Sequence, residues 1–373
     1  MSSEAIPAAR HPSCKPIGHS PIGKWFSKEE RGVNMKSRKA KGKLLAVFGI
    51  GAVLVGGSLV AACGSSSDSG SSGGTKDATL VLDFIPGPVH AGIYLAKEKG
   101  YYEDQGINLE IIEPTSTADT LKLIDAGKAD FGIADGIDLA DQISSGRGAK
   151  GIMALTQKPS GGLITLTKDG YKSPADLDGK TVGVTGVPSD DAILDTVMKG
   201  GGGNPDSVNK VTIGFNGVQN LENGKIDAFT GFIPADGVQL DVDGYPTTSF
   251  ALDAYGGPQY PGLVVFSTED KISSDPDLMQ GFVSATIQGY EETLDNEQAG
   301  LDALLKENPA IPEDFAKASL DAYMPMFQAN APQYGEFQTK NIEALVQFLL
   351  DNGLIDQSIP TDRYETNEFV DGS

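Results

Sequence analysis

The sequence predicts an α/β fold in which two lobes, each built on a mainly parallel sheet, are joined by two hinge crossovers. From residue 79 onward, short apolar runs alternate with stretches of helical periodicity, which is the pattern of parallel strands covered by helices. A second series of the same kind begins at the Gly-Lys-Thr of 179–181. Beyond residue 275 the apolar spacing is helical, and we expect these C-terminal helices to pack on the first lobe.

The chain before residue 79 has the order of a secretory leader. A basic stretch, 36–43, precedes an apolar run rich in small residues, 44–60, and Ala61-Ala62-Cys63 follows. A cysteine directly after small residues resembles the bacterial lipobox, in which the cysteine becomes the lipidated first residue of the mature protein. A single transmembrane anchor is the alternative, but the apolar run is short for one.

We therefore expect a lipoprotein signal peptide at 35–62, then a lipidated Cys63 and a flexible Gly- and Ser-rich tether over 63–78. Residues 1–34 show no apolar periodicity, and we expect a non-structural extension with Met35 as the true start. A disordered cytoplasmic extension is the alternative, so the translation of 1–34 stays open. This organisation predicts a protein anchored by lipid at the extracytoplasmic face of a bacterial cell membrane.

The first lobe is expected over 79–178, completed by 263–373. Its first strand ends in a Pro-Gly-Pro turn and a helix that starts near His90 and breaks at Gly106. The next helix follows capping side chains at 114–117, and Gly127 ends it. We expect strands at 79–83, 107–113, 131–134, 151–155 and 162–167, and helices at 90–105, 118–126 and 137–145.

The second lobe is expected over 179–262, with crossovers near 167–181 and 255–263. An extended segment at 263–267 would return the chain to the first lobe. We expect strands at 181–184, 211–215 and 227–230, and helices at 190–198 and 218–223. The C-terminal helices are expected at 275–295, 297–306, 313–327 and 339–352.

The composition excludes several classes of function. Residues 64–373 keep 19 of the 29 Lys and Arg and 48 of the 51 Asp and Glu, a formal net charge of −29. This charge argues against a nucleic-acid partner. No cysteine follows Cys63 and His90 is the one later histidine, so we expect no metal and no cofactor. Only two arginines remain, which weighs against an anionic ligand such as a sulfonate, nitrate or phosphate.

In an open parallel sheet, ligands bind outside the carboxyl ends of the strands. The residues that follow the predicted strands are aromatic side chains, carboxylates and hydrogen-bonding groups. They suit a flat, nitrogen-containing, neutral or cationic small molecule, because rings stack on it and carboxylates accept its N–H groups. The expected ligand-binding residues are Asp83, Phe84, Pro86, His90, Thr115, Asp135, Gln157, Gly186, Val187, Ser189, Asp190, Phe232, Asp236 and Tyr260.

These residues also have purely structural interpretations. Phe84, Phe232 and the further strand-end residue Phe215 could belong to the core. The role of Asp190 could be limited to capping a helix, and that of Asp83 to bonding within its turn. No G-x-S-x-G motif, P-loop or dinucleotide fingerprint occurs, so we expect no catalytic residue. Composition alone permits a pair of catalytic carboxylates, but no spacing supports one.

Four stretches together resemble the NMT1/THI5-like family of periplasmic binding proteins. They are LDFIPGPVHAGIYLAKEKGYYEDQGINLEIIEPT at 82–115, LIDAGKADFGIAD at 123–135, DLDGKTVGVTG at 176–186 and LENGKIDAF at 221–229. The resemblance implies a type II, two-lobed solute-binding component of an ABC importer that works with permease and ATPase subunits. The best-known ligands of this branch are aminopyrimidine precursors of thiamine. Riboflavin-binding relatives, and more distant sulfonate or nitrate binders, remain alternatives.

The family also has an enzyme branch that makes hydroxymethylpyrimidine from pyridoxal phosphate and its own histidine. Where that branch has Lys and His four residues apart, this chain has Ala134 and Asp138. Its phosphate-binding loop is replaced by the acidic segment 187–191, and its cysteine-rich iron motif is absent. We therefore expect a monomeric binding protein and no enzyme. An extracytoplasmic enzyme acting on pyrimidines and an adhesion or signalling lipoprotein are the rivals from other classes.

Overall fold

The computed structural model describes residues 75–372, which belong to one compact unit, Gly70–Ser373. The expected extension, signal peptide, Cys63 and most of the tether lie outside the described residues. Within 75–372, none of the helices combines the length and the apolar character that crossing a bilayer requires.

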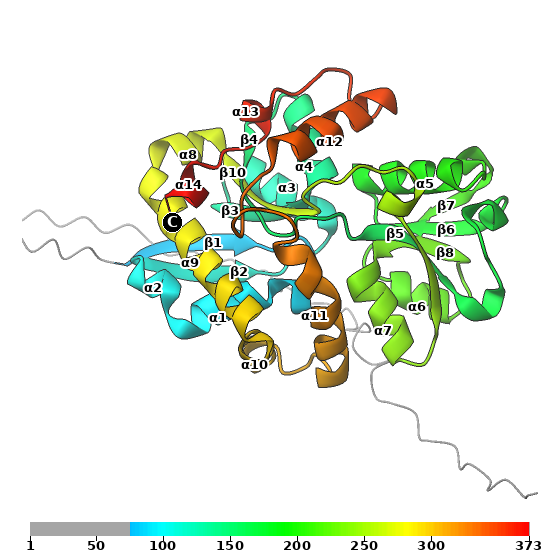
Figure 1. The fold of residues 1–373 in the computed structure, drawn as a ribbon, viewed down its shortest axis with the longest axis horizontal. Helices are drawn as coiled ribbons and strands as arrows, with labels where there is room; N and C mark the ends of the chain where they lie inside the picture. The colour runs from blue at the N-terminus through cyan, green and yellow to red at the C-terminus, as the bar shows by residue number, and fades with distance from the viewer. Residues whose placement is uncertain (1–74, 373) are drawn as a thin grey trace, which may run out of the picture. The chain divides into compact units, whose positions relative to one another are not determined.

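The first of two five-stranded sheets has the order β2-β1-β3-β10-β4 (Figure 1). Its parallel strands β2, β1 and β3 are followed by β10, which runs antiparallel to both β3 and β4. The bounds are β1 Lys76–Val81, β2 Ile107–Ile112, β3 Phe131–Asp135, β4 Ala149–Ala154 and β10 Leu263–Thr268. As expected, the segment at 263–267 returns the chain to this sheet.

The second sheet has the order β7-β6-β8-β5-β9. Its bounds are β5 Gly161–Leu166, β6 Thr181–Val184, β7 Asn209–Thr212, β8 Ala228–Phe232 and β9 Thr247–Ala251. Strand β5 pairs antiparallel with β8 and β9, whereas the predicted boundary at 178 left it in the first lobe. The first crossover therefore lies between β4 and β5. The run at 161–166 is buried along its whole length, and periodicity alone does not tell which sheet a fully buried strand joins.

Helices cover both sheets. Of the long C-terminal helices, α9, α10 and α12 pack on the first lobe, as predicted, whereas α11 also contacts α7 of the second lobe. Sequence analysis missed β9, which has only one fully buried side chain, and the short helices α7, α8, α13 and α14. Gly100, with φ of 79°, ends the first helix earlier than expected. The helices are α1 Ala91–Lys99, α2 Tyr101–Asp104, α3 Thr117–Asp125, α4 Gly136–Ser144, α5 Pro188–Gly200, α6 Gly217–Glu222, α7 Val238–Val242, α8 Glu269–Ser274, α9 Pro276–Asp295, α10 Glu297–Glu307, α11 Glu313–Phe327, α12 Thr339–Asp351, α13 Thr361–Tyr364 and α14 Glu368–Asp371.

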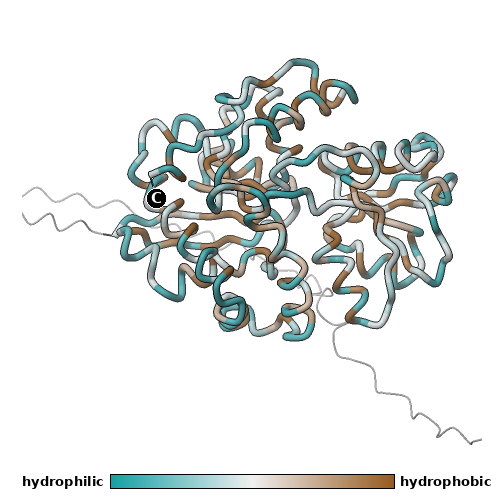
Figure 2. Tube along the Cα trace, in the orientation of Figure 1, coloured by the Kyte–Doolittle hydropathy of each residue, from teal (hydrophilic) through white to brown (hydrophobic). Residues whose placement is uncertain are grey.

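Hydrophobic residues are concentrated along the strands inside each lobe, and hydrophilic residues lie mainly on the outer turns of the helices (Figure 2). The first α-helix of the first lobe, α1, is held in place by a close crossing with α9. A Cβ at Gly289 would lie 2.2 Å from the Gly92 carbonyl oxygen, so this crossing requires glycine. It positions the one-turn helix η2, Pro88–His90, which precedes α1 at the carboxyl end of β1.

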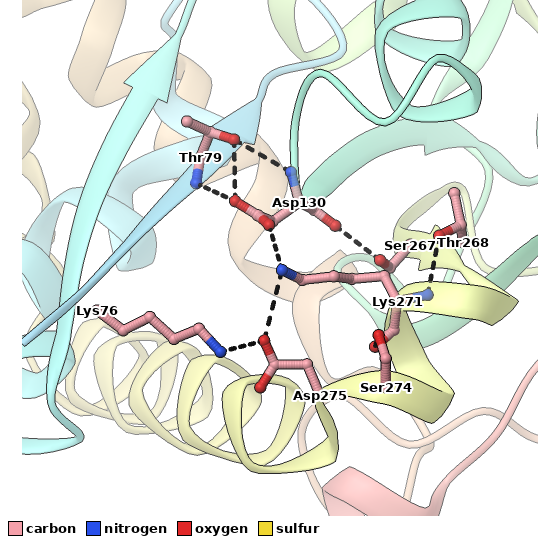
Figure 3. Close-up of polar contacts among 8 residues, drawn as sticks. All are labelled: Lys76, Thr79, Asp130, Ser267, Thr268, Lys271, Ser274 and Asp275. Carbon is pink, nitrogen blue, oxygen red and sulfur yellow. Dashed lines mark hydrogen bonds and ion pairs between the residues drawn. The ribbon is translucent and has the colours of Figure 1, made fainter.

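The opposite end of the first sheet is held by a network of ion pairs (Figure 3). Asp130 accepts hydrogen bonds from the Thr79 backbone and hydroxyl at 2.9 and 3.1 Å, and its other oxygen lies 2.7 Å from the Lys271 ammonium. Asp275 pairs with Lys76 and, at 3.4 Å, with Lys271. The network ties β1 and the start of β3 to helices α8 and α9.

Candidate functional site

A cavity of about 60 Å³ lies between the strand ends of the two sheets. Its walls come from the ends of β1 and β3 of the first sheet and of β6, β7 and β8 of the second, with the segments that follow them. The predicted residues that line it are Asp83, Phe84, Asp135, Val187, Ser189, Asp190, Phe232 and Asp236. The residues selected by the rule that ligands bind at carboxyl strand ends therefore form much of this wall.

Asp83 of the first wall is paired with His90, and both side chains are buried. The Gly87 backbone N–H donates to His90 Nδ1 at 3.2 Å, so Nε2 carries the proton and donates to Asp83 Oδ1 at 2.9 Å. The second oxygen of Asp83, Oδ2, has no hydrogen-bond partner among the described residues. His90 itself does not line the cavity; it lies behind Asp83 and orients that carboxylate.

Two further carboxylates sit on the first turn of α4. Asp135 caps this helix by accepting from the Ile137 N–H at 2.8 Å, and the Tyr260 hydroxyl approaches it at 3.4 Å. Asp138 follows three residues later, on the same face of the helix. Burial raises the pKa of Asp135 well above its ordinary value, and the nearby charge of Asp138 adds to this effect.

Asp138 joins the two lobes directly. Its Oδ1 accepts from the Ser189 backbone N–H at 2.8 Å, and its Oδ2 accepts from the Ser189 hydroxyl at 2.9 Å. Ser189 belongs to the first turn of α5, in the second lobe. Burial raises the pKa of Asp138 to about 7, against the effect of the two Ser189 donors. Sequence analysis did not include Asp138 in the site, although its spacing of three residues from Asp135 was a usable signal.

On the second wall, Asp190 is fully occupied by protein donors. One oxygen accepts from the Thr185 hydroxyl and from the N–H groups of Gly186 and Val187, at 2.7–3.0 Å. The other accepts from the Thr230 hydroxyl. This carboxylate therefore shapes the loop before α5 and has no oxygen free of protein donors.

Asp236 lies on a single π-helical turn, η6 Ile233–Gly237, which directly follows β8. One of its oxygens accepts from the Phe232 N–H at 2.8 Å. Burial raises the pKa of Asp236 to about 6, and this hydrogen bond opposes the shift.

Aromatic rings from the two lobes meet in the cavity. The Phe84 and Phe215 ring centroids lie 4.2 Å apart with an interplanar angle of 63°. The contact is edge-on, and both rings are half-buried. A flat ligand entering here would separate the two rings and stack against them.

Six predicted residues do not line the cavity. Thr115 is exposed and bonds to Asp119 at the start of α3, whereas the Gln157 amide donates to the Glu336 carbonyl at 2.8 Å. Tyr260 is buried behind Asp135, and Gly186, at φ of 104°, provides the turn held by Asp190. The complete set is Pro86, His90, Thr115, Gln157, Gly186 and Tyr260.

The cavity wall has carboxylates but no basic side chain. Among the described lining residues there is neither Lys, Arg nor His. Residues missed by sequence analysis supply a further carboxylate, hydroxyl groups and apolar surface, and they include Asp138, Thr185, Ile193, Ile213, Gly217, Phe229 and Thr230. No group of His, Cys, Asp or Glu within 75–372 has the arrangement to hold a metal ion.

The family model described as NMT1/THI5 like matches residues 87–300, which is more than half of the chain. The chain belongs to the NMT1/THI5-like family. A formylaminopyrimidine-binding protein of Halalkalibacterium halodurans is 25% identical over 75% of this chain and 86% of its own length. A 4-amino-5-hydroxymethyl-2-methylpyrimidine phosphate synthase of Legionella pneumophila is 27% identical over 67% of this chain and 79% of its own length.

Solved structures agree with the predicted fold. The alkanesulfonate-binding protein SsuA of Xanthomonas axonopodis pv. citri, bound to MOPS, superposes with a TM-score of 0.63. The match covers 78% of this chain and 98% of SsuA at 15% sequence identity. The NMT1/THI5-like chain therefore has the two-lobed fold of the periplasmic binding proteins.

Proposed function

We propose that this protein is the substrate-binding component of an ABC importer and captures a small nitrogen heteroaromatic, an aminopyrimidine precursor of thiamine, between its two lobes. It would deliver the ligand to permease and ATPase subunits. It would act as a lipid-anchored monomer, held through Cys63 at the extracytoplasmic face of the membrane. The similarity to a formylaminopyrimidine-binding protein supports the ligand class.

The main support is the chemistry of the cavity wall. Three carboxylates there, Asp135, Asp138 and Asp236, have raised pKa values because burial removes them from water. No basic side chain of the described wall offsets their charge. A ligand with N–H donors or a positive charge would relieve this cost, and the rings of Phe84 and Phe215 offer stacking surface.

The same wall argues against the anionic alternatives. A sulfonate or nitrate would face these carboxylates without an arginine or lysine to bind it. Riboflavin has a heteroaromatic ring that could stack, but it is much larger than a pyrimidine. The cavity of about 60 Å³ in this structure favours the smaller ring.

An enzyme of pyrimidine metabolism is the second candidate, because several relatives are named as pyrimidine phosphate synthases. The side chains at the positions corresponding to that branch's Lys and His are Ala134 and Asp138. Ala134 is buried in β3, and Asp138 binds Ser189. Neither side chain can form an imine with pyridoxal phosphate or supply imidazole atoms.

The direct test is binding by the purified full-length protein. We expect calorimetry to show one-to-one binding of 4-amino-5-hydroxymethyl-2-methylpyrimidine or its N-formylamino relative, with no product formed. Mass spectrometry should find the same class of compound co-purifying with the protein. A co-purifying sulfonate would refute the proposed ligand class, and turnover of the pyrimidine would favour the enzyme.

A further inference from the structure

Six buried side-chain polar atoms lack hydrogen-bond partners among the described residues, and two of them belong to segments around the cavity. They are Oδ2 of Asp83 and the hydroxyl of Tyr323. Their side chains are only 4% and 1% exposed. Buried polar groups are nearly always paired because an unmade hydrogen bond costs free energy. Two such atoms in one neighbourhood therefore indicate that a further molecule completes their bonding.

The fold brings these two atoms into one region. Tyr323 lies on α11, which packs against η2, the turn that carries His90, and against η6, the turn that carries Asp236. His90 in turn bonds to Asp83. Burial raises the pKa of Tyr323 well above its ordinary value, and the charges of Asp83 and Asp236 add to this effect. Asp83 and Asp236 line the cavity from opposite lobes, whereas Tyr323 lies behind its wall, within reach of the charges of both carboxylates.

The two atoms differ in hydrogen-bonding character. A carboxylate oxygen accepts hydrogen bonds, and Oδ2 is the free acceptor of Asp83 because Nε2–H of His90 already bonds to Oδ1. The Tyr323 hydroxyl beside these carboxylates has a proton to donate. Its ring is held by stacking on Phe327, with centroids 6.3 Å apart and an interplanar angle of 13°. An edge with an N–H donor next to a lone-pair acceptor would satisfy both.

We propose that Asp83 and Tyr323 together recognise one edge of the ligand, with Asp83 accepting from its amino group and Tyr323 donating to its adjacent ring nitrogen. This inference rests on the proposed binding function and deepens it. It makes Tyr323 a specificity-determining residue, contributed by a C-terminal helix for which the sequence offered only a pattern of apolar spacing. An amino group beside a ring nitrogen is the edge that distinguishes an aminopyrimidine from an aniline.

The test is a cycle that changes the protein and the ligand separately. The variants are wild type and Tyr323→Phe; the probes are 4-amino-5-hydroxymethyl-2-methylpyrimidine and its benzene counterpart, in which C–H replaces both ring nitrogens. We expect Tyr323→Phe to weaken binding of the pyrimidine roughly three- to tenfold, the value of one neutral hydrogen bond. Binding of the benzene counterpart should not change.

Tyr102→Phe is the matched control. The Tyr102 hydroxyl is also fully buried and, like Tyr323, Tyr102 is not a lining residue of the cavity, but its hydroxyl is paired with the Thr286 hydroxyl at 2.9 Å. Losing that bond should lower the melting temperature by about 2 °C and leave pyrimidine affinity unchanged. Tyr323→Phe removes no bond to the described residues, so its melting temperature should match that of the wild type.

The possible outcomes separate this inference from the proposed function. Wild-type protein that binds no aminopyrimidine would overturn both. Wild-type protein that binds one while Tyr323→Phe binds it equally well would overturn the inference alone. Equal weakening of both probes, or a loss of stability without a loss of affinity, would assign Tyr323 a structural role and also overturn the inference.

Discussion

Acidic side chains lie at both ends of the first sheet, but their hydrogen-bond and ion-pair partners differ between the two ends. At the end shown in Figure 3, Lys271 lies between Asp130 and Asp275, and Lys76 reaches Asp275 as well. At the cavity end, Asp83 and Asp135 have hydroxyl, N–H and imidazole partners but no ammonium or guanidinium group. The sheet therefore neutralises charge at one end and leaves it uncompensated at the other.

The titration of the two groups of acids reflects this contrast. Burial alone would raise the pKa of Asp275, but Lys76 and Lys271 outweigh it and hold that pKa below its ordinary value. For Asp138 burial prevails, and its pKa rises to about 7. A paired carboxylate stabilises the fold, whereas an unpaired buried one costs stability that a ligand can restore. The comparison predicts that removing charge has opposite effects at the two ends.

The largest expected effect is on ligand binding by Asp83→Asn. In the variant, His90 Nε2–H should donate to the amide oxygen, which then takes the position of Oδ1. The NH₂ group of the amide, a donor, then takes the position of Oδ2, an acceptor. We expect affinity for 4-amino-5-hydroxymethyl-2-methylpyrimidine to fall by about 100-fold, from a lost charge-assisted hydrogen bond and a donor facing a donor. Calorimetry measures the change. Asp195→Asn, which removes a surface acid paired with Lys199, is the control and should leave affinity unchanged.

The next effect is a gain in stability from Asp138→Asn. A folded-state pKa of about 7, above the unfolded value near 3.8, means that the group's contribution is present at low pH and is lost as pH rises through about 7. Asparagine does not ionise and can still accept from the Ser189 N–H. Wild type has already lost part of this contribution at pH 5, so we expect the stability advantage of the ligand-free variant over wild type to grow by roughly 2–3 kcal/mol from pH 5 to pH 8.

Urea unfolding at pH 5 and pH 8 tests this prediction. Groups that face Asp138 include Asp135, Asp141, Asp190 and Tyr260, and burial, not these charges, is the main cause of its shift. Because the Ser189 bonds join α4 to α5, the same variant also reports on the contact between the lobes. A variant that is less stable than wild type at both pH values would show that the charged Asp138 stabilises the contact between the lobes, contrary to this prediction.

Sequence reasoning selected residues that line the cavity where local order determines their position, and it missed residues whose position depends on tertiary contacts. Asp83 and Phe84 directly follow a strand, so the strand-end rule placed them at the cavity. Thr115 and Gln157 satisfy the same rule, but neither lines the cavity wall. Tyr323 lies more than 200 residues from the first strand, on a helix whose pattern shows only that one face is apolar.

The fold was predicted with a similar limit. Alternation of strands and helices gave two α/β lobes and the return of 263–267 to the first sheet. Strand β5 was assigned to the wrong side of the crossover, because an entirely buried run carries no periodicity to show its partners. Pairing between distant strands depends on the complete chain, and a single sequence records it poorly.

The smallest expected effect comes from Asp130→Asn at the paired end. The amide oxygen can still accept from Thr79, but the NH₂ group then faces the Lys271 ammonium, which keeps only its longer contact of 3.4 Å to Asp275. We expect a loss of about 1 kcal/mol in the free energy of unfolding, because this ion pair is only partly buried, and a smaller loss in high salt. Ligand affinity should not change. Urea unfolding at low and high salt measures the stability of Asp130→Asn. Comparing it with Asp138→Asn at pH 8 gives the effect of the same chemical substitution at both ends of one sheet. If both variants shifted stability in the same direction, the two ends would not differ in the way their charges are compensated.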